Sequence, residues 1–213
     1  VWLSQVYGKA SGTDRHRVVV WEVSGSLSDR DAGDELLAWL AYRRERLDGL
    51  VVMVAADELV GGDIDGAKRS ARQLSVLLGR ATKNFPGKLS ASLILSKCDL
   101  IDGFVPFFAG LRLDEQQVCG FSGQLGLRRG LQALLKSLNG RITQRLAEIR
   151  APGDCEAILT FPWEVESYGA LSCTFSEELA IQVQGIGIEE VYLCSARPSR
   201  ETAPSLRRKQ VPW

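Results

Sequence analysis

The sequence is poor in the residues that hold metal ions or form disulfide frameworks. It contains one histidine and five cysteines, at positions 98, 119, 155, 173 and 194, and none of the cysteines are spaced as Cys-x-x-Cys. Zinc sites use clustered cysteine and histidine ligands, and disulfide frameworks use an even number of cysteines. We therefore expect neither kind of site, and a reducing cytoplasm fits the cysteine content best.

The sequence also lacks an excess of charge of one sign and a long apolar run. Lysine plus arginine and aspartate plus glutamate both total 26, so no overall field favours nucleic acid or an anionic membrane. No stretch approaches the roughly 20 apolar residues of a transmembrane helix, and no signal peptide opens the chain. The 213 residues are long enough for one sizeable core, and the start at Val1-Trp2 suggests a fragment of a longer protein.

A phosphate-binding loop is missing as well. Gly8-Lys9 followed by Ser11 resembles one only loosely, because the P-loop requires Gly-x-x-x-x-Gly-Lys-[Ser/Thr] after a strand. The acidic connection from Asp57 to Asp63 holds three carboxylates. We interpret it as a solvated loop with a helix cap rather than as a metal site.

The stretch around Leu93 carries the strongest local signal. Its apolar residues are followed directly by the polar sequence Ser96-Lys97-Cys98-Asp99. This pattern is typical of a buried parallel strand whose carboxyl end lies at a ligand-binding crevice. A strand that ends in Lys-x-Asp occupies the guanine-reading position of GTPase-like folds. There the carboxylate accepts hydrogen bonds from the base while the lysine stem packs along the ring.

Strands are predicted near Val18, Leu50, Leu93 and Val191, with helices between them. This alternation predicts an α/β fold with a mostly parallel sheet of P-loop-NTPase or GTPase-like type and a helical insertion before the last strand. We divide the chain into four parts. Residues 1–124 form the core, which lacks its first strand and P-loop, and residues 125–189 form a helical insertion. Residues 190–198 form the last core strand and its end, and residues 199–213 form a tail. Within the insertion, Ala157–Pro162 is expected to be extended.

Several segments resemble the IcmF/TssM family of type VI secretion inner-membrane proteins, which has relatives in type IVB systems. The matching segments are Val20–Gly25, Trp39–Val54, Lys97–Phe108, Gln117–Phe121, Thr160–Pro162 and Val191–Ala196. The resemblance implies a domain on the cytoplasmic face of the bacterial inner membrane, with membrane helices outside this chain. It also implies contacts with the other inner-membrane subunit and with baseplate components.

The resemblance implies roles for six residues if the nucleotide site is functional. Lys97 and Asp99 would contact the base, the backbone N–H groups at Ser195-Ala196 would lie beside it, Gly25 would lie near the terminal phosphate, and Glu22 near magnesium. Glutamate stands where GTPase-like proteins carry an aspartate, which alters the metal end of the site.

Three functional hypotheses remain open at this point. The first is a docking scaffold with a degenerate nucleotide site and no catalytic residues. The second is a switch that binds GTP or ATP with magnesium, and that becomes a possible NTPase if a P-loop lies upstream of Val1. The third is a small regulatory GTPase-like protein, against which the matches at Asp102–Phe104 and Phe161-Pro162 argue.

Overall fold

The computed structural model describes residues 2–7, 17–22, 30–43, 47–60, 63–85, 87–109, 119–148 and 152–195. The strands are β1 (Trp2–Tyr7), β2 (Arg17–Glu22), β3 (Leu50–Ala55), β4 (Leu89–Ser96), β5 (Cys119–Ser122) and β6 (Ile186–Leu193). The helices are α1 (Arg30–Arg43), α2 (Ala56–Val60), α3 (Ile64–Asn84), α4 (Phe104–Phe108), α6 (Leu127–Glu148) and α7 (Pro152–Gln182), with a 3-10 turn at Cys98–Leu100.

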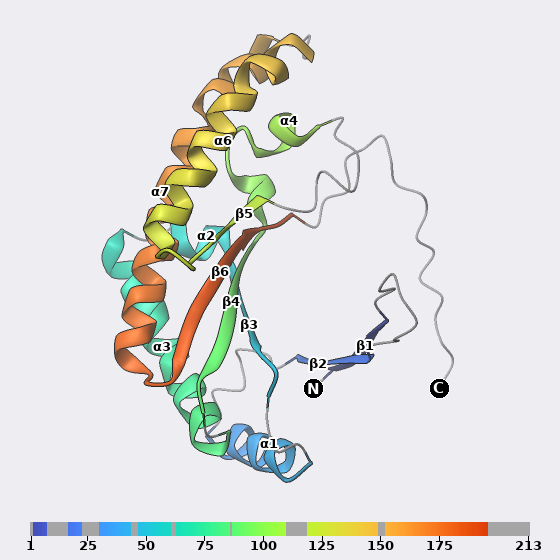
Figure 1. The fold of residues 1–213 in the computed structure, drawn as a ribbon, viewed down its shortest axis with the longest axis vertical. Helices are drawn as coiled ribbons and strands as arrows, with labels where there is room; N and C mark the ends of the chain where they lie inside the picture. Colours follow the sequence, from blue (N-terminus) through green and yellow to red (C-terminus); the bar gives the residue numbers. More distant parts are fainter. Residues whose placement is uncertain are drawn as a thin grey trace.

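A four-stranded sheet forms the centre of the molecule, with the strand order β3-β4-β6-β5. Strands β3, β4 and β6 are parallel, and Leu93 of β4 lies opposite Val52 on one side and Val191 on the other. The short edge strand β5 runs antiparallel to β6, which makes the sheet mixed (Figure 1). The expectation of a mostly parallel α/β sheet is confirmed, while β5 was seen in the sequence only as a matching motif.

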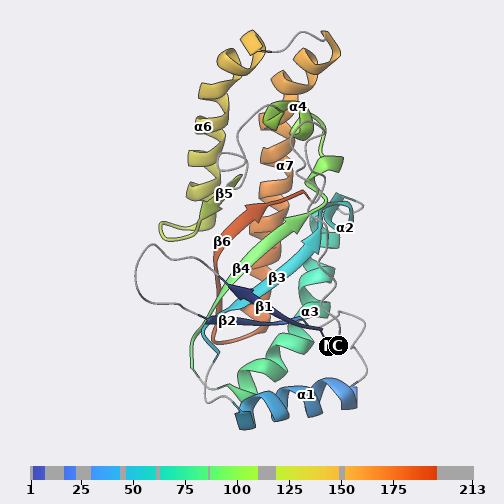
Figure 2. The same cartoon turned by 90° about the vertical axis from the view of Figure 1, so that its right-hand side faces the viewer.

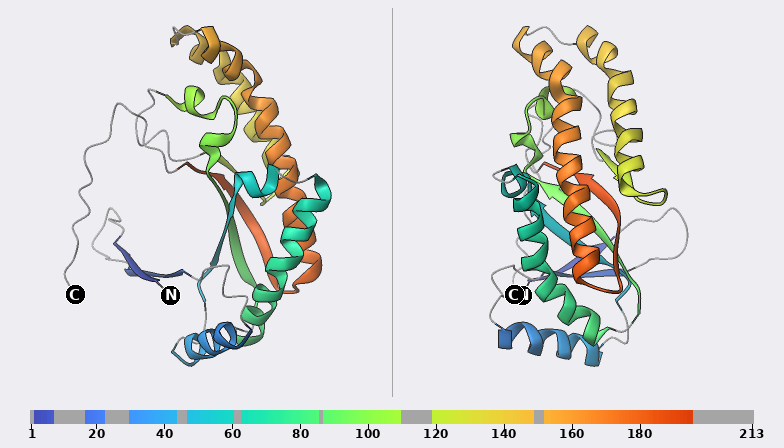
Figure 3. Two further views of the ribbon diagram at one scale, coloured as in Figure 1. Left: turned by 180° about the vertical axis from the view of Figure 1, so that it is seen from behind. Right: turned by 90° about the vertical axis from the view of Figure 1, so that its left-hand side faces the viewer.

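Helices cover one face of this sheet. α3 and α7 pack against each other over the strands, and α6 packs against α7 and β5 (Figure 3). Side chains alternate along β4, so that Leu89, Ala91, Leu93 and Leu95 are buried under this layer. The other face of the strands is turned toward the viewer in Figure 2, with the helices behind it.

α3 shows how the sequence sets a helix boundary. Asp63 precedes the first turn, and its side chain accepts a hydrogen bond of 3.0 Å from the backbone N–H of Gly66. This is the N-cap that satisfies an amide left without a partner at a helix start. The expected cap in the acidic connection is therefore confirmed, and Asp57 and Glu58 lie in the short helix α2 instead of a loop.

Two further expectations from the sequence are wrong. The strand near Val18 exists as β2, but it pairs antiparallel with β1 in a separate two-stranded sheet, in register Val6 to Val18. Strands that follow each other closely in sequence pair readily as an antiparallel hairpin. The segment Ala157–Pro162 is helical within α7, because Phe161 and Pro162 are both buried there and packing outweighs the helix-breaking tendency of proline.

None of the described helices is long and apolar enough to cross a membrane.

Candidate functional site

The carboxyl ends of β3, β4 and β6 meet at one edge of the sheet, as they must in adjacent parallel strands. The chain continues from β4 into the 3-10 turn through Lys97, whose backbone is left-handed, with φ 57° and ψ 31°. A lysine in this region is uncommon and carries strain, which is found most often at functional sites. This turn directs the polar residues after β4 to the edge of the sheet.

The ends of β4 and β6 are joined by backbone hydrogen bonds. The N–H of Cys194 donates to the carbonyl of Leu95 at 2.8 Å, and the N–H of Cys98 donates to the carbonyl of Cys194 at 3.0 Å. These bonds continue the parallel pairing beyond the last ladder residues. They fix the turn after β4 against the end of β6, although the two segments lie about a hundred residues apart in sequence.

Asp99 and Ser195 are brought together by this pairing. The Ser195 hydroxyl donates a hydrogen bond of 2.8 Å to Oδ1 of Asp99. Each residue was assigned to the base-reading end of the site from its position after a different strand, and the structure places both at the same edge. A carboxylate held in this way keeps a defined orientation, which recognition of a planar base requires.

Lys97 lies on the other side of the turn and pairs with a residue from the end of β3. Its Nζ lies 3.0 Å from Oδ2 and 3.3 Å from Oδ1 of Asp57, in the first turn of α2. The hydrogen bond from Lys97 lowers the pKa of the Asp57 carboxyl below its ordinary value. Both side chains remain about half exposed, so this ion pair adds little to stability.

The remaining predicted site residues are not part of this cluster as far as the structure describes it. Glu22 is the last residue of β2 and belongs to the separate two-stranded sheet. Gly25 and Ala196 lie outside the described residues. The described structure brings Lys97, Asp99 and Ser195 to one edge of the sheet, and the nucleotide-binding roles of all six residues stay predictions.

Cys98 lies at the centre of this turn but has no reactive thiol. Its side chain is fully buried, and its Sγ lies 3.1 Å from the carbonyl oxygen of Leu95. Burial raises the pKa of this thiol to about 12. The thiolate is therefore not formed at neutral pH, and Cys98 serves as a packing residue. Among the described residues, no cluster of three or more histidine, cysteine or acidic side chains could hold a metal ion.

The turn after the site is anchored to α7 by two of the motifs that carried the resemblance. Phe161 is fully buried, and its ring packs 5.9 Å from that of Phe104 and 4.8 Å from that of Phe107, measured between centroids. Gly103 approaches the backbone of α7 so closely that a Cβ atom there would lie 2.2 Å from the carbonyl oxygen of Ala157. The Gly-Phe and Phe-Pro motifs therefore act together to hold α7 behind the carboxyl end of β4.

Sequence reasoning missed two charged residues that shape this region. Asp57 was assigned to a solvated loop, although it pairs with Lys97. Arg145, near the end of α6, has the pattern of a solvent-facing helix cation, yet only 4% of it is exposed. Its guanidinium donates to the carbonyls of Pro106 and Ala109 and pairs with Glu148, which ties α6 to the end of α4. The sequence does not show this contact, because it depends on where the end of α4 lies relative to Arg145 in the folded chain.

The fold and the site define an α/β domain with a polar cluster at the carboxyl edge of its parallel strands, held from behind by a long helix. A family model described as the IcmF-related N-terminal domain matches residues 28–184, which is more than half of the chain. The chain belongs to this family, and this relates it to type VI secretion. No curated protein and no solved structure matches the chain significantly.

Proposed function

We propose that this chain is a docking domain of a secretion membrane complex, on the cytoplasmic face of the bacterial inner membrane. The observation that carries the proposal is the family match over residues 28–184. Its partners are the other inner-membrane subunit and baseplate components of the same machine. In this role the domain needs a stable α/β body with accessible apolar surface and no catalytic residue.

The exposed side chains support a docking role. Large apolar residues are exposed on the sheet at Val51 and Met53, and on α7 at Leu159, Trp163 and Ile181. These exposed residues lie on both sides of the sheet, so each side offers apolar side chains to a partner. The candidate site also holds its own polar groups in place, since Asp57 pairs with Lys97 and Ser195 donates to Asp99. The edge is thus ordered by contacts within the chain.

Binding to purified secretion subunits tests the docking proposal. The protein is immobilised, and the inner-membrane partner subunit and each baseplate component are passed over it one at a time. We expect specific binding of at least one subunit with a dissociation constant in the micromolar range or below. If the folded protein binds none of them, the docking function is wrong.

A nucleotide-controlled switch is the second candidate, and the outer edge of β3 favours it. In the described part of the chain no strand pairs with this edge, although β3 is an apolar parallel strand of sequence LVVMVA. The exposed edge of an apolar strand invites pairing with a further strand, and natural proteins usually cover or block such edges. A further parallel strand beside β3 would bring a P-loop to the edge that carries Lys97 and Asp99.

Calorimetric titration distinguishes the switch from the scaffold. GTP, ATP and their non-hydrolysable analogues are titrated with magnesium into the protein, into Asp99→Ala and into the control Asp102→Ala. Asp102 is an exposed carboxylate three residues further along the chain. Micromolar binding that Asp99→Ala abolishes and Asp102→Ala retains would establish a switch. A folded sample that gives no heat with any nucleotide would leave docking as the function.

A further inference from the structure

The long helix α7 carries large apolar residues at exposed as well as at buried positions. Its inner side is buried through Phe161, Val165 and Phe175, yet Leu159, Trp163 and Ile181 are exposed on the outside, with Trp163 69% accessible. Glu166, Ser167 and Glu177 are also exposed on α7. The exposed part of α7 therefore mixes large apolar with polar side chains, as protein contact surfaces do.

A groove lies along this outer side, between α7 and the starts of its two neighbours. It has a volume of about 510 Å³, and α7 contributes Ser167, Ala170, Leu171 and Thr174. Three of these four side chains are small, which allows another helix to approach closely. α7 lies between α3 and α6 in the view onto the helical layer (Figure 3), so that the two helices form the walls of the groove.

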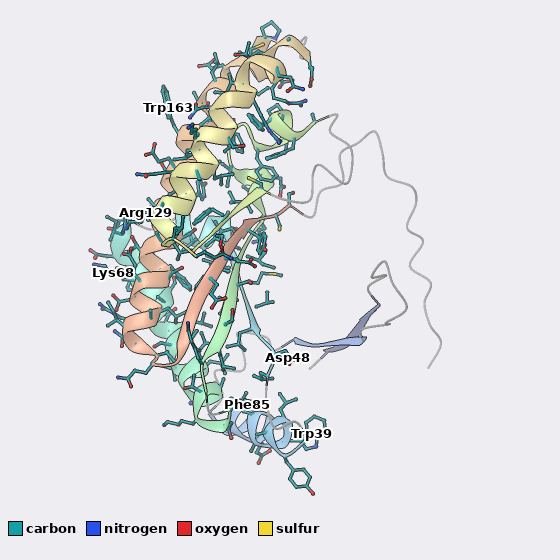
Figure 4. All side chains as sticks on the ribbon, viewed as in Figure 1. Trp39, Asp48, Lys68, Phe85, Arg129 and Trp163 are labelled. Carbon is teal, nitrogen blue, oxygen red and sulfur yellow. The ribbon has the colours of Figure 1, made fainter. Side chains whose placement is uncertain are left out.

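Trp163 lies beyond the groove, in the same row of α7 side chains as the lining residues Ser167, Ala170 and Thr174. Positions 159, 163, 167, 170 and 174 follow the spacing of three and four residues that places helix side chains in one row. Figure 4 shows Trp163 projecting outward from α7, away from the rest of the molecule. Exposed tryptophans are enriched among the residues that dominate binding energy at interfaces.

Among the residues that line the groove, acidic side chains outnumber basic ones. The start of α3 contributes Asp63 and Asp65 to one wall. Arg128 on the opposite wall is already paired with Glu177 through two hydrogen bonds of 2.8 and 2.9 Å, and this pairing lowers the pKa of the Glu177 carboxyl. The Arg128 charge is compensated within the chain, and the guanidinium of Arg69 lies near Asp63 on the α3 wall. Asp65 is then the lining carboxylate best placed to complement a cationic group of a partner.

We propose that this groove binds an amphipathic helix of a secretion-complex subunit. The contact face of that helix carries small and aliphatic residues that pack along Ala170 and under Trp163, and a flanking lysine or arginine pairs with Asp65. Helix-in-groove recognition is a common mode for apolar grooves with charged rims. The inference rests on the proposed docking function and names the surface that performs it.

Matched surface variants test the groove against each purified secretion subunit. Trp163→Glu removes the exposed aromatic side chain, and Asp65→Lys reverses a groove charge without touching the Asp63 cap. Val76→Glu is the control, because Val76 is also exposed but lies further along α3, outside the groove. We expect Trp163→Glu to weaken binding about tenfold or more. Asp65→Lys should weaken binding and reduce its salt dependence, and Val76→Glu should bind within about twofold of the unmodified protein.

A photo-crosslinking amino acid in place of Trp163 identifies the bound segment directly. We expect mass spectrometry to find it joined to a helical segment with an apolar face and basic residues beside it. If a subunit binds, but Trp163→Glu and Asp65→Lys bind as tightly as the unmodified protein, the groove proposal is overturned while the docking function stands. If the folded protein binds no subunit, both proposals are wrong.

Discussion

Gly103 shows how one residue connects the candidate site to the helical layer. Its backbone is left-handed, with φ 79°, at the point where the chain enters α4. A side chain at this position would meet backbone atoms of α7, with Cβ 2.2 Å from the carbonyl oxygen of Ala157 and 2.8 Å from the Cβ of Phe161. Only glycine satisfies both demands, since it lacks Cβ and tolerates positive φ.

Replacing Gly103 by alanine should therefore destabilise the protein strongly. We expect Gly103→Ala to lower the free energy of unfolding by about 3 kcal/mol or more, because the clash involves backbone that cannot rotate away. Gly126→Ala is the control: φ is 95° there, but nothing lies within 4 Å of a Cβ atom. That change should cost about 1 to 2 kcal/mol. Urea denaturation measures both, and equal losses would show that the contact with α7 is unimportant.

Glu178 provides a prediction about pH. Its carboxylate accepts hydrogen bonds from Arg72 Nε at 2.8 Å and from Gln182 at 2.9 Å, and these partners lower its pKa below the ordinary value of 4.5. A group with a lowered folded-state pKa stabilises the protein fully above its ordinary pKa. That contribution is lost as the pH falls through the lowered value.

Glu178→Gln should therefore lower the melting temperature at neutral pH and reduce the loss of stability in acid. The measurement is the melting temperature from about pH 7 down to about pH 3. Glu166→Gln, at an exposed position on the same helix, is the matched control and should follow the unmodified protein. An acid profile of Glu178→Gln that parallels the unmodified protein would contradict the assigned role.

At the scale of elements, α6 carries two glycines with opposite functions. A Cβ atom at Gly130 would lie 2.1 Å from the carbonyl oxygen of Ser122 in β5, whereas at Gly140 it would meet nothing within 4 Å. Gly130 therefore lets α6 approach the edge strand closely. Gly140 lies exposed in the helix interior, where glycine only weakens the helix.

Alanine at these two positions should change stability in opposite directions. Gly140→Ala should raise the free energy of unfolding by about 0.5 to 1 kcal/mol, because alanine restricts the unfolded chain and favours the helix. Gly130→Ala should lower it by about 2 kcal/mol or more, because α6 must move away from β5. Chemical denaturation of both variants gives the comparison. A stabilising Gly130→Ala would mean that α6 is not packed on β5.

The elements differ in how far their sequences predict them. α3 was predictable because its apolar spacing, acidic start and Asp63 cap all indicate the same helix. α7 was harder, because its apolar residues point in all directions and Pro162 suggests a break. The same holds for β2: the sequence before Val18 predicts a strand and a hairpin turn, but not that the resulting pair stays separate from the parallel sheet. Pairing and packing with distant segments decide such cases, and a local pattern does not contain that information.

The residues of the candidate site also differ in how far the sequence predicts their positions. Lys97, Asp99 and Ser195 were predictable because each follows an apolar strand, and parallel strands bring their carboxyl ends to one edge. The ion pair from Asp57 to Lys97 and the burial of Arg145 were not predictable, because they depend on where a helix begins or ends in space.

At the scale of the whole molecule, the four-stranded sheet is covered by helices on one face (Figure 1). On the opposite face, 64% of Val51 and 66% of Met53 are exposed, whereas their neighbours Val52 and Val54 are buried under the helical layer. Parallel strands usually have both faces covered. This face, which is open at Val51 and Met53 in the described part of the chain, can therefore accept a further layer from the same polypeptide or from a partner.

Lysine substitutions along β3 test this arrangement. Met53→Lys should change the free energy of unfolding by about 1 kcal/mol or less, because the side chain already faces water. Val54→Lys should cost more than about 3 kcal/mol, because it places an unpaired charge beneath α3 and α7. Thermal and urea denaturation measure both changes. If Met53→Lys proves as harmful as Val54→Lys, a second layer already covers this face. If Met53→Lys folds normally but fails to bind a subunit that the unmodified protein binds, the open face is itself a docking surface.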